Sequence, residues 1–266
     1  MHDVIIVGGS SGVQTLALSS RTLTISGIMT VKANGAFVAT SSTVAGAGAL
    51  VNLGVLNLKG TSVTTTGGLD NQATVIANAA VSVTGTLTTS AGSLLRLLAD
   101  GSTGFSTFTS ANSFTNNGAI EMTTATSSYS ATLAVSGSNT LTNAPGGTIT
   151  SLVGTGGTRT IDAQLANQGT LTLAQPLTLT HAGAAHTSSA SSSACTSADD
   201  SDADTRSSAC GALSSSSRKR AGASAGLTGT STALSLACAL VAGARRTETC
   251  EPTTSAGGRA PPCAPQ

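Results

Sequence analysis

The feature that most constrains the fold is a short motif that recurs along the first two-thirds of the chain. In residues 165–173, LANQGTLTL, an apolar residue, a spacer and Asn precede a short link and then alternating apolar and small or polar residues. Gly and Asn tolerate the positive φ of tight corners, and period-two alternation predicts a β-strand. We therefore interpret each copy as a corner followed by a strand. The corner asparagines are Asn52, Asn71, Asn116, Asn143 and Asn167.

The spacing of these asparagines predicts a repeat architecture. The intervals are 19, 45, 27 and 24 residues, and the 45-residue interval corresponds to two repeats. A looser ladder of apolar residues between small polar neighbours gives the same period, about 21–23 residues. We expect roughly eight such coils, stacked at about 4.8 Å so that backbone hydrogen bonds join one coil to the next. The predicted fold is all-β, a parallel β-helix (β-solenoid). A β-sandwich is the alternative, and the repeated Asn corner favours the solenoid over it.

Two roles remain open for the repeated Asn. Stacked amide side chains can form a ladder in which each side chain bonds to the next coil. Asn also favours turns without any ladder.

Composition divides the chain at residue 180. Residues 1–180 contain every Ile, Asn, Phe, Met and Tyr, whereas residues 181–266 contain none of these and hold all five Cys. We predict a β-solenoid over 1–180 and a low-complexity, disordered tail over 181–266, because Ser- and Ala-rich sequence buries too little apolar surface to offset chain entropy. A GC-rich gene read out of frame would give this composition. The tail is therefore either a frameshift product or a genuine flexible segment.

Charge and hydropathy argue against several classes of partner. The net charge is +1 and charged residues are sparse, which does not suit nucleic acid or an anionic membrane surface. No apolar run approaches the ~20 residues of a membrane-spanning helix, and the first residues, MHDVIIVGG, lack the basic region of a secretory signal. The following Gly-rich turn has Val7 where a dinucleotide-binding fingerprint needs its first glycine. We predict no cofactor.

The sequence predicts neither a catalytic site nor a metal site. The acids of residues 1–180 form no local pair, and Asp162 near Arg159 suggests a surface ion pair. No GxSxG elbow occurs. His181 and His186 have no third ligand at metal-site spacing, and the cysteines form no CxxC pair. We therefore expect a protein that is not an enzyme. The five acids are Asp3, Asp70, Asp100, Glu121 and Asp162.

Paired threonines suggest a binding surface. The pairs flank single apolar residues, and on one flat face they would resemble the threonine surface of solenoid ice-binding proteins. The other explanation is that Thr is a good strand former whose hydroxyl suits a solvent-facing position. The pairs are Thr22/Thr24, Thr86/Thr88, Thr148/Thr150 and Thr170/Thr172.

Three motifs, LxNxGTLTL, SGIMTVKANG and TGTLTTSAG, resemble the degenerate repeats of bacterial surface and secreted proteins. These are the β-helical passenger regions of autotransporter and filamentous-haemagglutinin-like adhesins, and the resemblance covers about residues 13–180. It implies a right-handed parallel β-helix, an extracellular or cell-surface location and a structural or adhesive role. It carries over no catalytic residues. The family's secretion signal, outer-membrane barrel and calcium-binding nonapeptides do not occur in the sequence, so we expect a fragment of a longer exported chain.

Three functional hypotheses follow. The first is a structural or adhesive segment that contacts a surface or glycan ligand of unknown identity. The second is a threonine-array surface binder, and the third is a carbohydrate-active β-helix enzyme whose acids converge from different coils. If the chain is a fragment, its uncapped coils would expose strand edges, and we expect end-to-end self-association through them.

Overall fold

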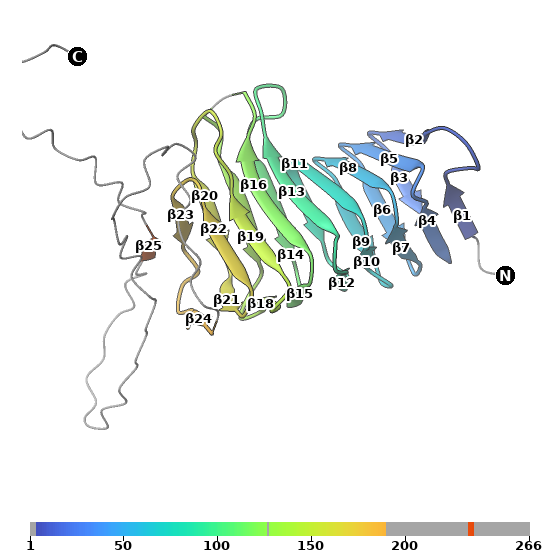
Figure 1. Ribbon diagram of the computed structural model, residues 1–266. Helices are drawn as coiled ribbons and strands as arrows, with labels where there is room; N and C mark the ends of the chain where they lie inside the picture. The colour runs from blue at the N-terminus through green and yellow to red at the C-terminus, as the bar shows by residue number, and fades with distance from the viewer. Residues whose placement is uncertain (1–3, 127, 190–233, 237–266) are drawn as a thin grey trace, which may run out of the picture.

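The computed structural model describes residues 4–126, 128–189 and 234–236 (Figure 1). These residues form 25 β-strands and contain no helix. Parallel strands stack coil upon coil into an elongated solenoid, coloured from blue to yellow along its length in Figure 1. The predicted all-β parallel solenoid is confirmed, and the β-sandwich alternative is wrong.

Each coil contributes one strand to each of three faces, which we call A, B and C. Face A comprises β1 (Val4–Val7), β4 (Ile28–Val31), β7 (Ala49–Asn52), β10 (Leu69–Asn71) and β12 (Leu87–Thr89), followed by β15 (Phe114–Asn116), β18 (Thr140–Asn143), β21 (Gln164–Asn167) and β24 (Thr187–Ser188). Face B comprises β2 (Gln14–Ser19), β5 (Gly35–Thr40), β8 (Val55–Lys59), the first half of β11 (Thr74–Val83), β13 (Leu94–Ala99), β16 (Ala119–Thr124), β19 (Thr148–Ser151) and β22 (Thr170–Leu173).

Face C comprises β3 (Thr22–Thr24), β6 (Thr43–Gly46), β9 (Ser62–Thr65), the second half of β11, β14 (Ser106–Ser110), β17 (Ala131–Val135), β20 (Arg159–Asp162) and β23 (Leu177–Leu179). The short strand β25 (Leu234–Leu236) pairs with β23 and runs antiparallel to it. All other strand pairs within the described residues are parallel, as a solenoid requires.

The strand register gives the length of a coil. Val7 on β1 and Ser188 on β24 occupy equivalent positions eight coils apart, which averages about 22.6 residues per coil and agrees with the predicted repeat. The long interval between Asn71 and Asn116 holds two coils, as predicted. Asn71 pairs with Thr89 on β12, and β15 lies next to β12 on face A.

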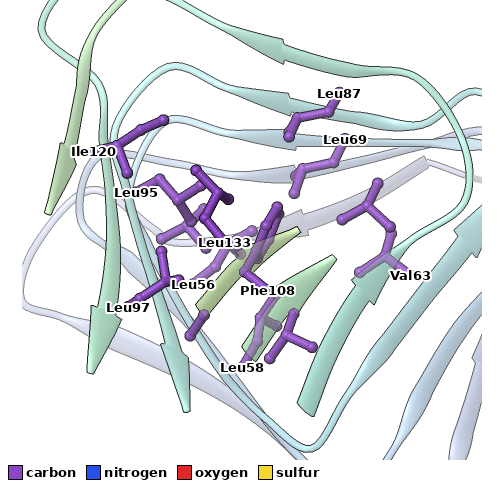
Figure 2. Packing of buried hydrophobic residues seen from close by; sticks show 14 of the residues in the cluster. Leu56, Leu58, Val63, Leu69, Leu87, Leu95, Leu97, Phe108, Ile120 and Leu133 are labelled. Atoms are coloured by element: carbon purple, nitrogen blue, oxygen red, sulfur yellow. The ribbon is translucent and has the colours of Figure 1, made fainter. Parts of the chain in front are cut away.

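Alternate side chains of every face point inward and form one continuous core. Figure 2 shows Leu69 and Leu87 from face A, Leu56 and Leu95 from face B and Phe108 from face C meeting inside the coils. Each is almost completely buried. Removing such a side chain from water contributes about 1.5–3 kcal/mol, so stacked layers of Leu, Val, Ile and Phe stabilise the rod without a single large core.

The solenoid extends past the predicted domain boundary at residue 180. Strand β24 pairs with β21, and the Leu165 N–H donates to His186 Nδ1 at 3.2 Å. Residues 181–189 therefore belong to the last coil. Apart from these and β25, the predicted tail, including its five cysteines, lies outside the described residues.

Candidate functional site: the solenoid corners and face C

The predicted corner asparagines end the face A strands, where the chain turns towards face B. All five side chains are buried, with exposures of 0–6%. Asn52 Nδ2 donates to Asn71 Oδ1 at 2.8 Å, which joins two successive coils. Asn116 Nδ2 donates to Asn143 Oδ1 at 2.9 Å, and Asn143 Nδ2 donates to Asn167 Oδ1 at 2.8 Å. An amide ladder thus runs through the core in two sections.

The same amides also stabilise their own turns. Asn52 Oδ1 accepts a hydrogen bond from the Gly54 N–H at 3.1 Å within its own turn, and Asn52 Nδ2 also donates to the Thr74 carbonyl of the next coil at 2.9 Å. An amide side chain supplies both a donor and an acceptor, which is why Asn suits this position. The two roles that the sequence left open, turn residue and ladder member, are combined in one side chain.

The residue between the two sections of the ladder is Thr89, which the sequence analysis missed. It occupies the corner position equivalent to Asn71. Its Oγ1 donates to the Thr115 carbonyl at 3.0 Å and accepts from the Asn117 N–H at 2.8 Å. A hydroxyl therefore replaces the amide, and the signal in the sequence is Leu87-Thr88-Thr89, which matches the corner motif with Thr in place of Asn.

Glycine follows two residues after several corner asparagines because the preceding coil is too close for a side chain. A Cβ at Gly54 would lie 2.1 Å from the Lys32 carbonyl oxygen, and one at Gly169 would lie 2.2 Å from the Ala144 carbonyl oxygen. These distances are far below van der Waals contact. The Asn-x-Gly element of the motif therefore combines a buried amide with a close backbone approach.

The corner between faces B and C has two forms. In the first four coils it turns at a single residue with positive φ: Ser20 (52°), Ser41 (48°), Gly60 (56°) and Ala79 (54°). In the next three coils the strands of faces B and C are joined by longer links, residues 100–105, 125–130 and 152–158. The first of these projects as the teal loop at the top of Figure 1.

Arg159, at the end of the third long link, is not the surface ion pair that the sequence suggested. Its side chain is 1% exposed, and burial lowers the pKa of its guanidinium. Backbone carbonyls, not a carboxylate, accept its hydrogen bonds. They are those of Met122 (3.3 Å), Leu152 (3.3 Å), Gly156 (2.7 Å) and Gly157 (3.1 Å). Arg159 therefore fixes the link 152–158.

Asp162 instead contacts His181. His181 Nδ1 lies 2.9 Å from Asp162 Oδ1, and its Nε2 lies 2.7 Å from the Gly137 carbonyl oxygen. Each ring nitrogen of His181 therefore faces an oxygen atom. The neighbouring His186 differs, because its Nδ1 accepts from a backbone N–H and its pKa is lowered by burial and by His181. Within the described residues no three His, Cys, Asp or Glu side chains come together to hold a metal ion.

The described acids are separated in space. Asp70 lies on face A and accepts from Thr88 Oγ1 at 2.7 Å, while Glu121 lies on face B in an ion pair with Arg96 at 2.6 Å. Asp100 lies in the projecting loop and Asp162 on face C. Asp3 is outside the described residues. This distribution gives no support to paired-carboxylate chemistry.

The four predicted threonine pairs do not share one face. Thr22/Thr24 lie on face C, Thr86/Thr88 lie at face A, and Thr148/Thr150 stack on Thr170/Thr172 on face B. The hydroxyl-rich face is face C. Every outward side chain of its parallel strands within the described residues is Thr or Ser, except Ala45, Ala80, Ala134 and Asp162. Its longest threonine column is Thr107, Thr132, Thr160 and Thr178.

No protein-family model matches the sequence, and comparisons with curated proteins and with solved structures likewise find no match. The part of the chain that the structure describes holds no helix able to cross a membrane. The resemblance to autotransporter and haemagglutinin-like repeats therefore stays a prediction, as does the expected location.

Proposed function

We propose that this chain is a non-catalytic rod segment with a structural or adhesive role in a bacterial cell-surface or secreted repeat protein. The observation that supports it best is the outer surface of face C, which presents rows of Thr and Ser hydroxyls along the length of the rod. Over the described strands this surface carries one charged side chain, Asp162. A long, nearly uncharged hydroxyl surface suits contact with another extended hydroxylated surface, because each hydroxyl both donates and accepts.

The test is retention of the full chain on insoluble polysaccharides and on isolated bacterial cell walls, together with an assay for released reducing sugars. We expect retention without sugar release. Release of sugars would instead support the carbohydrate-active enzyme hypothesis. A chain that passes unretained through every material would contradict the adhesive part of the proposal.

The stacked columns of face C also favour a second candidate, a threonine-array binder of the ice-binding kind. Columns repeat at about 4.8 Å from coil to coil and about 6.7 Å along each strand, and β-branched Thr has few χ1 rotamers, so the hydroxyl lattice is rigid. Thermal hysteresis of the freezing point tests this candidate. We expect a concentration-dependent gap that Thr132→Glu abolishes. Freezing behaviour equal to that of a matched control protein would exclude it.

We also propose end-to-end association through the first coil that the structure describes. Within the described residues, β1, β2 and β3 each pair with one neighbour only. Leu16 is the first residue in a column of inward-facing side chains and is 36% exposed. Phe37, its partner in the next coil, is 0% exposed. Edge strands of this kind pair with other chains. Sedimentation velocity should show concentration-dependent oligomers that Ala17→Lys, in the middle of β2, reduces. A monomer at every concentration would contradict this proposal.

A further inference from the structure

Two of the five aromatic side chains are exposed, and both lie at the same corner of neighbouring coils. The chain has four Phe, one Tyr and no Trp. Phe37, Phe108 and Phe114 are buried in the core, whereas Phe105 is 49% exposed and Tyr129 is 46% exposed. Both exposed residues belong to the long links between faces B and C. An exposed aromatic ring leaves a large apolar surface in water, so two together point to a contact surface.

The strand register places the backbone that carries Phe105 next to Tyr129 in the following coil. Ser106 pairs with Ala131, and the Ser106 N–H donates to the Ser130 carbonyl at 2.9 Å. Gly104 therefore lies beside Tyr129. A Cβ added at Gly104 would lie 3.9 Å from a carbon of the Tyr129 ring. The Tyr129 ring thus covers the backbone one residue before Phe105.

Hydroxyl groups extend from this patch across face C. Thr158 Oγ1 donates to Ser130 Oγ at 2.9 Å, next to Phe105 in the strand register. The following outward column is Thr107, Thr132 and Thr160, all partly exposed. The surface thus changes within a few residues from aromatic to hydroxyl. Across β14, β17 and β20 the single outward charge is Asp162, which His181 already contacts.

The links that carry the two rings are held by hydrogen bonds. Asp100 Oδ1 accepts from the N–H and the hydroxyl of both Ser102 and Thr103, at 2.7–2.8 Å. Desolvation acts in the opposite direction, but these bonds keep the pKa of Asp100 below its ordinary value. The Gly101 N–H donates to Thr126 Oγ1 at 2.8 Å, which ties the first long link to the second.

The second link is fixed in turn by its own contacts and by the third. Thr124 Oγ1 donates to the Tyr129 carbonyl at 2.9 Å. A Cβ at Gly157 would lie 2.1 Å from the same carbonyl oxygen, so the link that Arg159 fixes packs directly against Tyr129. Hydrogen bonds and close packing therefore hold the described residues next to Phe105 and Tyr129, which reduces the entropy lost when a ligand binds.

We propose that this patch binds a neutral glycan chain, with Phe105 and Tyr129 stacking on sugar rings and Ser130, Thr132 and Thr158 exchanging hydrogen bonds with sugar hydroxyls. Pyranose rings present C–H faces to aromatic rings and hydroxyls at their edges, which is the pattern that the patch offers. The three long links and the face C strands that follow them carry no exposed Lys or Arg within the described residues, which disfavours nucleic acid and acidic glycans, since these ligands need cationic side chains. The inference rests on the proposed adhesive role and specifies where and what the rod binds.

Tyr129 provides a direct probe of the site. Because the chain has one Tyr and no Trp, its intrinsic ultraviolet emission comes from this residue. The full chain is titrated with soluble oligosaccharides of β-1,4-glucan, β-1,3-glucan, xylan and mannan, and emission is recorded. We expect a saturable change with at least one of them. Phe105→Ala should weaken that binding about tenfold, and Thr132→Val should weaken it severalfold.

Two control variants test whether the loss of binding is specific to the patch. Leu53→Ala removes an exposed apolar side chain at the corner between faces A and B, and Thr43→Val removes a face C hydroxyl three coils from Phe105. Both should bind like the unmodified chain. Circular dichroism of each variant should match that of the unmodified chain, since all four substituted side chains are on the outside of the rod.

Three results would overturn the inference. The first is a titration in which no neutral oligosaccharide changes the emission, and the second is equal binding of an acidic glycan such as alginate. The third is loss of self-association, without loss of glycan binding, in Phe105→Ala, which would make the patch a contact between copies.

If the chain is retained on insoluble polysaccharide but Phe105→Ala is retained equally well, the site is wrong and the adhesive role stands. If nothing retains the chain, the adhesive role is wrong as well.

Discussion

The corner between faces B and C is built differently in coils one to four and in coils five to seven, whereas the corner between faces A and B keeps a buried polar side chain from the third coil to the eighth. In coils one to four the B–C corner turns at one residue of positive φ, such as Ser41 or Ala79. In coils five to seven it is a link of six or seven residues that carries Phe105, Tyr129 and Arg159. The A–B corner uses a buried amide or hydroxyl in coils three to eight.

The difference shows which corner maintains the repeat. The amide ladder fixes the A–B corner from inside, and the strands on either side stay in register. The B–C corner is then free to lengthen without disturbing the core. Long links are where exposed and chemically distinctive side chains gather, as loops on a rigid scaffold generally allow. The predictions below test the constant corner first and then the variable one.

Asn143→Ala should have the largest effect. Its amide accepts from Asn116, donates to Asn167 and donates to the Thr170 carbonyl at 3.2 Å, so its loss removes three hydrogen bonds from the core. We expect the free energy of unfolding to fall by about 3–4 kcal/mol in urea denaturation. Asn57→Ala, on the outside of face B, is the control and should change it by less than about 0.5 kcal/mol. Equal effects of the two substitutions would show that the ladder does not maintain the repeat.

Arg159→Met should have the next largest effect and should act on the long-link half. Burial is retained, but the carbonyls of the link 152–158 lose their donor. We expect a loss of about 2–3 kcal/mol and faster proteolysis within that link. Arg21→Met provides the contrast, because Arg21 is exposed at a short B–C corner. Unchanged proteolysis in Arg159→Met would mean that the link holds its shape without the guanidinium.

At the positive-φ positions of the short corners, introducing glycine should stabilise the fold and removing glycine should destabilise it. Ala79→Gly should raise the free energy of unfolding by about 1 kcal/mol, because glycine adopts this conformation without steric strain. Gly60→Ala should lower it by about the same amount, although a Cβ there has room, its nearest neighbour being 3.9 Å away. Thermal unfolding checks both. Ala80→Gly, which lies next to Ala79 in β11, should not stabilise. The same sign for Ala79→Gly and Gly60→Ala would contradict the backbone argument.

The smallest expected effect is a pH response at the last coil. The pKa of His186 is lowered in the folded chain, so the unfolded chain binds the proton first as pH falls below about 6.5. The contribution of this residue to stability is therefore present above that pH and decreases as the solution becomes acidic. Once His186 is protonated, its Nδ1 can no longer accept from the Leu165 N–H. The protection factor against hydrogen exchange, which corrects for the intrinsic pH dependence, should fall in acid more at Leu165 than at Leu141, which has no such partner. An equal fall in the protection factors at Leu165 and Leu141 would contradict this prediction.

Much of the architecture was readable from local sequence. Alternation of apolar and small polar residues predicted strands, and the recurring Leu-x-Asn-x-Gly pattern predicted both the corners and a coil of 21–23 residues. The pattern succeeds because each coil must repeat the same inward column and the same close backbone approach at Gly54 or Gly169. These requirements act within a few residues of one another, so they leave a local signature.

The positions of individual side chains around the rod were decided by tertiary structure. Successive coils differ in length: Asn71 and Thr89 are 18 residues apart, whereas Thr89 and Asn116 are 27 apart. A constant period therefore misplaces residues, and a shift of one residue moves a side chain from the core to the surface. For this reason the sequence did not reveal that the threonine pairs separate onto three faces or that Arg159 is buried. The same register places Gly104, the residue before Phe105, beside Tyr129, because a contact between coils depends on the summed length of every residue between them.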